Sequence, residues 1–151
     1  MMKEEFYTLK GYKIKNEETL SSSMEDYIEM IFRLSKDGKE VRVRELSQAL
    51  NVQPPSTTKM IRRLAREGYV FYEKYGCINL TEKGEKLGSK LLDRHKTIFE
   101  FLKSIGVEKN ILEQTEIMEH AVNDEVLSRI KKLTEFLKKC HQNNDRNNGE
   151  N

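Results

Sequence analysis

A three-residue turn followed by two consecutive prolines constrains the fold of this chain more than any other feature. The apolar pattern of residues 41–50 predicts a helix, residues 51–53 form the turn, and Pro54-Pro55 open a second helix. Proline suits the first turn of a helix because its missing N–H would have no partner there. Gly68 ends the second helix, so the sequence predicts two helices joined by a short turn.

Two short strands are predicted directly after this pair of helices. Residues 69–75 and 77–80 are rich in aromatic and β-branched side chains, and Gly76 supplies the turn between them. A helix-turn-helix followed by a hairpin is the order of elements in a winged-helix DNA-binding domain. Positive charge is concentrated here as well: residues 39–74 hold eight Lys or Arg against four Glu, although the formal net charge of the chain is only +2.

Helices are predicted on both sides of this segment, which makes the fold class mostly α. An earlier helix, capped by Ser22 or Ser23, carries an apolar stripe that begins at Met24. A long helix begins at Thr81, a shorter helix with many acidic residues follows, and Asn123 caps a last helix.

The composition excludes other classes of protein. No apolar run approaches the length of a membrane span, and the charged N-terminus is unlike a signal peptide. Cys77 and Cys140 lie far apart without CxxC spacing, so neither a disulfide framework nor a structural zinc site is expected. We therefore expect a cytoplasmic protein with no membrane partner.

The outer face of the second helix supplies candidate contacts to double-stranded DNA. Residues at the N-terminus of such a helix reach base edges, whereas long cations reach phosphates. The candidates for base edges are Gln53, Ser56 and Thr57 with Pro55 beside them, and those for phosphates are Lys59, Arg62, Arg63 and Lys74. A winged-helix module buries little DNA by itself, so we expect a homodimer on a two-fold operator.

Glu116, Glu119 and His120 form a second distinctive pattern. On a helix they lie at i, i+3 and i+4, which is one face. Carboxylate oxygens suit Mn and Fe, and imidazole is the commonest nitrogen ligand, so this face is either half of a divalent-cation site or an ordinary solvated surface. The candidate partners on the other helices are Asp26, Glu29 and His95.

Several short segments give the chain a resemblance to a known family. They are Ser23-Met-Glu-Asp-Tyr-Ile-Glu29, Pro55-Ser-Thr-Thr-Lys-Met60, Tyr72-Glu-Lys-Tyr75, Leu80-Thr-Glu-Lys-Gly84, Arg94-His95 and Glu116-Ile-Met-Glu-His120. In this order and spacing the chain resembles, from about residue 23 to residue 138, the metal-dependent transcriptional regulators of the diphtheria toxin repressor class. Within that class it is most similar to the manganese transport regulators.

The resemblance implies a two-metal site and a function. The family's metal ligands fall on Asp26, Glu29, His95, Glu116, Glu119 and His120. These residues would hold Mn²⁺, two ions per subunit, or Fe²⁺ or another divalent cation. Glu119 resembles the manganese type, because iron-responsive relatives carry a sulfur-containing residue there and a hard oxygen ligand disfavours softer metals. The implied function is a repressor of metal-ion uptake genes that divalent metal activates for operator binding.

The resemblance also implies the domain organisation. It consists of an N-terminal extension (1–22), a winged helix-turn-helix DNA-binding domain (23–84) and a C-terminal helical metal-binding and dimerisation domain (85–140), followed by an Asn-rich tail (141–151) that we expect to be disordered. The chain is too short for the third, SH3-like domain of longer relatives, and the extension has no counterpart in the family pattern.

Other functions are weighed against this one. A winged-helix regulator could respond to iron or to a small organic ligand, which would need a pocket between the long helices. A carboxylate-bridged di-metal enzyme would need two Glu-x-x-His motifs, and the chain contains neither these nor HExxH, GxSxG or a phosphate-binding glycine loop. We therefore expect neither an enzyme nor a small-molecule substrate. A pure interaction protein would need the basic helix to face another protein.

Overall fold

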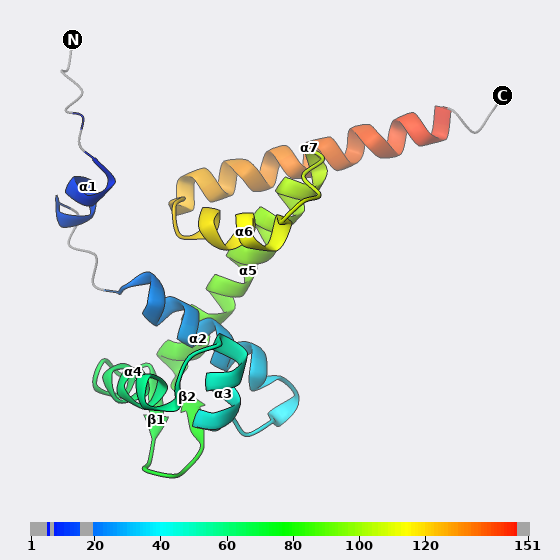
Figure 1. Ribbon diagram of the computed structural model, residues 1–151. Helices are drawn as coiled ribbons and strands as arrows, with labels where there is room; N and C mark the ends of the chain where they lie inside the picture. The colour runs from blue at the N-terminus through cyan, green and yellow to red at the C-terminus, as the bar shows by residue number, and fades with distance from the viewer. Residues whose placement is uncertain (1–5, 7, 16–19, 148–151) are drawn as a thin grey trace.

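The computed structural model describes residues 6, 8–15 and 20–147, and the helices dominate it (Figure 1). The elements are α1 (Leu9–Lys15), α2 (Ser22–Leu34), a 3-10 turn η1 (Lys36–Gly38), α3 (Val43–Leu50), α4 (Pro54–Arg66), β1 (Val70–Tyr72), β2 (Ile78–Leu80), α5 (Glu82–Ser104), α6 (Ile111–Glu119) and α7 (Asp124–Asn147). The predicted mostly α fold, with a two-stranded wing after the helix pair, is confirmed.

One apolar core holds α2, α3, α4, the wing and the start of α5 together. Helix α5 contributes Leu91, which is slightly exposed, and the other elements contribute the more deeply buried side chains. They are Met24, Ile28, Ile31, Val41, Leu46, Ile61, Leu64 and, nearly buried, Val70 and Ile78. This core fixes the orientation of α4 relative to α2.

The turn between α3 and α4 has the chemistry that the sequence predicts. Asn51 caps α3 with a positive φ of 54°, a conformation that asparagine tolerates better than most residues. The two prolines occupy the first two positions of α4. Inside the angle between the helices, the Ser47 hydroxyl donates to Thr57 Oγ1 at 2.9 Å. This buried hydrogen bond ties α3 to α4.

The wing is shorter than predicted but receives an additional partner. Val70 pairs with Leu80 and Tyr72 with Ile78 in the antiparallel register. Val41, predicted to start the helix that is now α3, lies outside it. Its carbonyl instead accepts from the backbone N–H of Ile78 at 2.7 Å, and its side chain is fully buried. A β-branched residue packs well in this extended position, so α3 begins two residues later.

The N-terminal cap of α2 differs from the prediction. Ser21, rather than Ser22 or Ser23, caps α2, because its hydroxyl accepts from the N–H of Met24 at 3.3 Å.

Close packing of α2 against α5 joins the two halves of the chain. Gly88 on α5 lies against Phe32 on α2, where a Cβ would come within 2.6 Å of Phe32 Cβ. Only a glycine permits this approach of the two helices.

The long helix α5 runs from α2, α3, α4 and the wing at the bottom of Figure 1 to the helices at the top. There α6 and α7 pack on it. As predicted, Thr81 caps α5 and Asn123 caps α7 through its side-chain oxygen. Several large apolar side chains of this upper half remain exposed, namely Ile105, Leu112, Ile117, Val126, Leu133 and Phe136.

The C-terminal segment differs from the prediction. The sequence predicts a disordered tail from residue 141, but α7 continues to Asn147. Once a helix exists, each added residue gains a hydrogen bond without a new nucleation cost, so even a polar Asn-rich sequence can extend it. Residues 1–5, 7 and 16–19 of the N-terminal extension and residues 148–151 lie outside the described part. No helix in the described ranges is long and apolar enough to cross a membrane.

Candidate functional site

The six predicted metal ligands, five within helices and one at a helix C-terminus, lie in one cluster. Asp26 and Glu29 lie one turn apart on α2, and His95 lies on α5. Glu116 and Glu119 lie on one face of α6, and His120 is the residue that caps its C-terminus. The cluster therefore takes ligand-type side chains from both halves of the chain.

The six side chains form two overlapping groups. Asp26, Glu116, Glu119 and His120 each offer a ligand atom within 4.8 Å of the others, and so do Glu29, His95, Glu116 and Glu119. Glu116 and Glu119 belong to both groups. Two carboxylates shared by two sets of oxygen and nitrogen donors suit a pair of neighbouring divalent cations.

Glu119 lies at the centre of the cluster. Its side chain is only 4% exposed, and its Oε2 lies 2.8 Å from His95 Nδ1. Its Oε1 lies 3.7 Å from His120 Nε2. A buried carboxylate between two imidazoles is costly in an apolar core, so its surroundings must supply positive charge or hydrogen bonds.

His120 has a different carboxylate on each side of its ring. Nε2 lies 2.8 Å from Asp26 Oδ1 and faces the cluster. Nδ1 lies 3.3 Å from Glu25 Oε2 on the other side. Glu25 was not among the predicted site residues, since its neighbour Asp26 carries the family pattern.

Burial of negative charge changes the acidity of the cluster. It raises the pKa of the carboxyl groups of Asp26, Glu29 and Glu116. The hydrogen bond to Glu119 raises the pKa of His95. In both cases the raised pKa favours the protonated form, which reduces the net negative charge of the cluster. The cluster is therefore short of positive charge.

The donor set fits a divalent cation. Glu29 is largely buried, yet its Oε1 has no hydrogen-bond partner among the described residues and lies 3.5 Å from Arg33. A buried carboxylate oxygen without a hydrogen bond is expensive, and ligation would satisfy it. Glu116 is half-exposed at 50%, which leaves the cluster open to solvent on one side.

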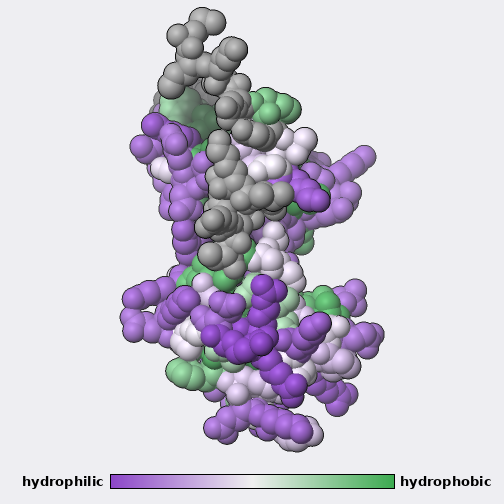
Figure 2. All heavy atoms as spheres, turned by 90° about the vertical axis from the view of Figure 1, so that its left-hand side faces the viewer, coloured by the Kyte–Doolittle hydropathy of each residue, from purple (hydrophilic) through white to green (hydrophobic). Residues whose placement is uncertain are grey.

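A second functional surface lies along α4. Of the predicted DNA contacts, Gln53 precedes the helix and the others lie on it or in the wing turn. Those that are exposed are Gln53, Pro55, Ser56, Lys59, Arg62, Arg63 and Lys74. Figure 2 looks onto the side on which α4 lies in Figure 1, and the lower part of that face is mostly hydrophilic.

Thr57 does not belong to this surface. Its side chain is fully buried and bonded to Ser47 in the angle between α3 and α4. The prediction that Thr57 contacts a base edge is therefore wrong. Its position belongs to the apolar stripe of α4, and its hydroxyl is used within the core.

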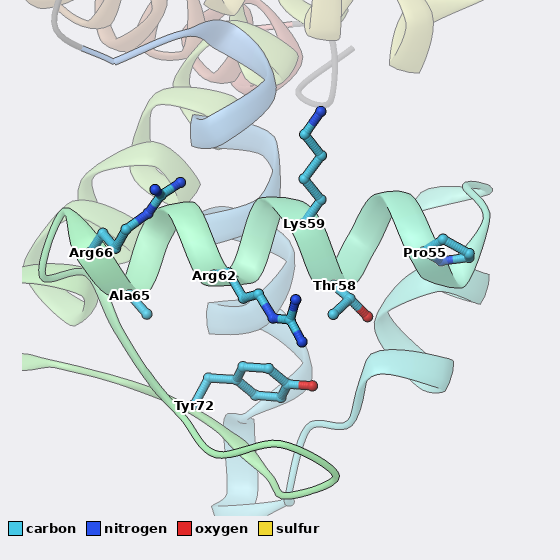
Figure 3. A pocket seen from close by; sticks show the side chains of 7 residues that line it. All are labelled: Pro55, Thr58, Lys59, Arg62, Ala65, Arg66 and Tyr72. Atoms are coloured by element: carbon cyan, nitrogen blue, oxygen red, sulfur yellow. The ribbon is translucent and has the colours of Figure 1, made fainter.

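A groove of about 720 Å³ separates α4 from the wing (Figure 3). Its lining residues are Pro55, Thr58, Lys59, Arg62, Ala65, Arg66 and Tyr72. In Figure 3 the Arg62 guanidinium extends toward the Tyr72 ring of the wing, while Lys59 points to the opposite side of α4. Within the described part of the chain, none of Lys59, Arg62 and Arg66 forms an ion pair, so their charges are available to phosphates.

Comparison with known proteins decides the family. Family models of the iron dependent repressor match the N-terminal DNA binding domain over residues 19–78 and the metal binding and dimerisation domain over residues 81–147. The HTH-type transcriptional regulator MntR of Lysinibacillus sphaericus is 42% identical over 116 residues, covering 76% of this chain and 84% of that protein. The chain belongs to the iron-dependent repressor family. The resemblance predicted from the short segments is confirmed.

Other members of the iron-dependent repressor family agree. MntR of Geobacillus thermodenitrificans is 41% identical over 76% of this chain and 82% of that protein. Among solved structures, the manganese regulator SloR is 29% identical with a TM-score of 0.67, covering 75% of this chain and 54% of that one. A manganese-dependent transcriptional repressor in complex with manganese is 26% identical with a TM-score of 0.69, covering 75% and 53%. This chain thus spans about half the length of these solved relatives.

Three polar residues that line the groove, Thr58, Arg66 and Tyr72, were not among the candidate DNA contacts of the sequence analysis. Thr58 and Arg66 lie on the same helical face as Pro55 and Arg62, so the helical period alone could have found them. Tyr72 could not be found in this way, because it reaches the groove only through the folding of the wing beside α4.

Proposed function

We propose that this member of the iron-dependent repressor family is a manganese-responsive DNA-binding repressor of metal-ion uptake genes. The observation that carries the proposal is the origin of the cluster: Asp26 and Glu29 come from the DNA-binding half, while Glu116, Glu119 and His120 come from the dimerisation half. A site built from both halves can couple ion binding to their relative arrangement.

Electrostatics supplies the coupling. A bound divalent cation supplies the positive charge that lets the buried carboxylates lie together. Without it, the carboxylates of Asp26, Glu29, Glu116 and Glu119 repel one another across the contact between α2 and α6, which favours looser packing of the two halves. Ligation by residues of both halves would restrict where α4 can lie. DNA binding would then cost less conformational entropy, because less of the protein remains to be ordered. Metal and DNA would therefore each raise the affinity for the other.

The DNA-binding surface is assigned to α4 and the wing. Gln53, Pro55 and Ser56, which are exposed at the N-terminus of α4, are the residues that we propose for base edges in the major groove. Lys59, Arg62, Arg63 and Lys74 are exposed cations for the phosphates. The domain match to a dimerisation domain supports a homodimer, and two copies of α4 would then contact a two-fold operator.

Manganese is favoured over other metals by the chemistry of the ligands and by the relatives. All six side chains offer oxygen or imidazole nitrogen and none offers sulfur. The relatives include proteins named as manganese regulators. We assign two Mn²⁺ ions per subunit, one to each overlapping group, with Fe²⁺ as the competing ion.

An organic effector or a catalytic role is less well supported. The space between α5 and α7 is about 170 Å³ and is lined by charged side chains such as Lys96, Glu100 and Lys138, which suits no apolar ligand. The family consists of transcriptional regulators, and we propose no reaction for this chain.

The test is a metal-by-metal DNA-binding titration. A duplex is first selected from a random-sequence pool by the protein with Mn²⁺, and its affinity is then measured by fluorescence anisotropy without metal and with Mn²⁺, Fe²⁺, Zn²⁺ or Mg²⁺. We expect Mn²⁺ to tighten binding by roughly 5- to 150-fold, the usual range of a coupling between sites, and Mg²⁺ to have little effect. Equal affinity with and without Mn²⁺ would contradict activation by metal.

A further inference from the structure

Glu25 lies outside both groups of candidate ligands, yet its side chain contacts the candidate ligand His120. Its Oε2 lies 3.3 Å from His120 Nδ1, while His120 Nε2 lies 2.8 Å from Asp26. The two nitrogens of one imidazole thus face two consecutive residues of α2. Only Nε2 points toward the other ligand atoms.

The two contacts differ in what they can do for an ion. A neutral histidine that ligates through Nε2 carries its proton on Nδ1, and a metal-bound histidine usually donates that proton to a carboxylate or carbonyl. Glu25 Oε2 is in position to accept it. We propose that Glu25 is a positioning residue, which holds the His120 ring with its Nε2 lone pair directed at the ion shared with Asp26. The inference rests on the proposed metal-responsive function.

A simpler explanation for an acidic residue at position 25 is the helix dipole, and the test must distinguish it from the hydrogen bond to His120. Glu25 lies in the first turn of α2, where a negative charge stabilises a helix through its dipole. That effect needs the charge and not the hydrogen bond. Replacement by glutamine removes the charge but keeps an acceptor oxygen, whereas replacement by alanine removes both.

The experiment compares Glu25→Gln and Glu25→Ala in the full chain by calorimetric titration with Mn²⁺. We expect wild type to bind two ions per subunit. Glu25→Ala should weaken the ion shared by His120 and Asp26 about 10- to 100-fold, which is the usual loss when a partner of a metal-bound histidine is removed, and weaken the other ion less. Glu25→Gln should restore most of the affinity.

A spectroscopic measurement reports the hydrogen bond itself. In protein loaded with Zn²⁺, a diamagnetic substitute for Mn²⁺, imidazole NMR should show a slowly exchanging Nδ1 proton on His120 in wild type and Glu25→Gln. The same proton should exchange rapidly in Glu25→Ala. The control is Glu113→Ala, which removes an exposed carboxylate from the first turn of α6 and should change neither readout.

Each outcome decides between the explanations. If Glu25→Gln is as weak as Glu25→Ala, the charge matters and the positioning role is overturned. The same holds if Glu25→Ala binds both ions as wild type does. Wild-type protein that binds no Mn²⁺ would instead overturn the proposed function, and the role of Glu25 with it.

Discussion

At the scale of single residues, Glu119 is the residue that we propose decides which metal the cluster accepts. It is buried, belongs to both groups and contacts His95. We predict that Glu119→Cys relaxes selectivity toward Zn²⁺ and Fe²⁺, because a thiolate is a softer ligand than a carboxylate. Competition titrations of each metal against Mn²⁺ measure this.

The matched control for that substitution is Glu113→Cys, which places a thiol on an exposed position of the same helix. It should leave the order of metal affinities unchanged. If Glu119→Cys also leaves the order unchanged, Glu119 is not the selectivity residue.

The residues show what a sequence can and cannot predict. The spacing of Glu116, Glu119 and His120 on one helical face follows from the helical period, and the structure brings them to the predicted partners. Glu25 could not be predicted in the same way, because its contact with His120 spans 95 positions and depends on how α2 and α6 meet. Thr57 was misplaced because a short polar residue near a helix start serves a buried hydrogen bond as readily as a DNA contact.

At the scale of elements, the approach of α5 to α2 sets the distance between His95 and the ligands on α2. We predict that Gly88→Ala destabilises the protein by up to about 2 kcal/mol, since an overpacked contact costs roughly 1–3 kcal/mol and the gain in helix propensity returns about 1 kcal/mol. It should also weaken Mn²⁺ binding, because Phe32 Cβ can move away only if α2 shifts.

Chemical denaturation and metal titration of the same variant test both effects. Ser89→Ala is the control, since it raises helix propensity at the neighbouring exposed position of α5 without entering the contact. A Gly88→Ala protein that is as stable as Ser89→Ala would refute the close-packing account.

The cations of α4 give a prediction about DNA. Arg62 lies in the groove beside the wing without a carboxylate partner among the described residues. If it contacts a phosphate, Arg62→Ala weakens binding to all sequences alike and lowers the salt slope by about 1. Affinity measured over a salt series shows this, with Lys86→Ala on the exposed face of α5 as the control. An unchanged slope removes Arg62 from the phosphate contacts.

Element boundaries depart from the prediction where tertiary contacts outweigh local preference. Val41 continues the apolar pattern of the following helix, but its backbone pairs with the wing, a contact that sequence periodicity cannot reveal. At the other end, the composition of residues 141–147 indicates disorder, while the helix before them allows continuation.

At the scale of the whole molecule, the exposed apolar residues of α6 and α7 are the surface we assign to the homodimer. Leu133 is 48% and Phe136 61% exposed. We predict that the double substitution Leu133→Glu and Phe136→Glu produces a monomer in analytical ultracentrifugation and weakens operator binding, because charges placed in an apolar interface must be desolvated. Ser128→Glu adds charge at an exposed position of α7 outside the stripe and should remain dimeric.

We expect the two carboxylates that occur in both groups to determine how steeply the protein responds to metal. Glu116 and Glu119 cannot be arranged for one ion without being arranged for the other. The first ion would therefore prepare half of the ligands for the second, so the occupied fraction rises more steeply than for a single site. We therefore expect a regulator built in this way to respond weakly at low ion concentrations and more steeply above them. It would act closer to a threshold detector than to a graded sensor of supply.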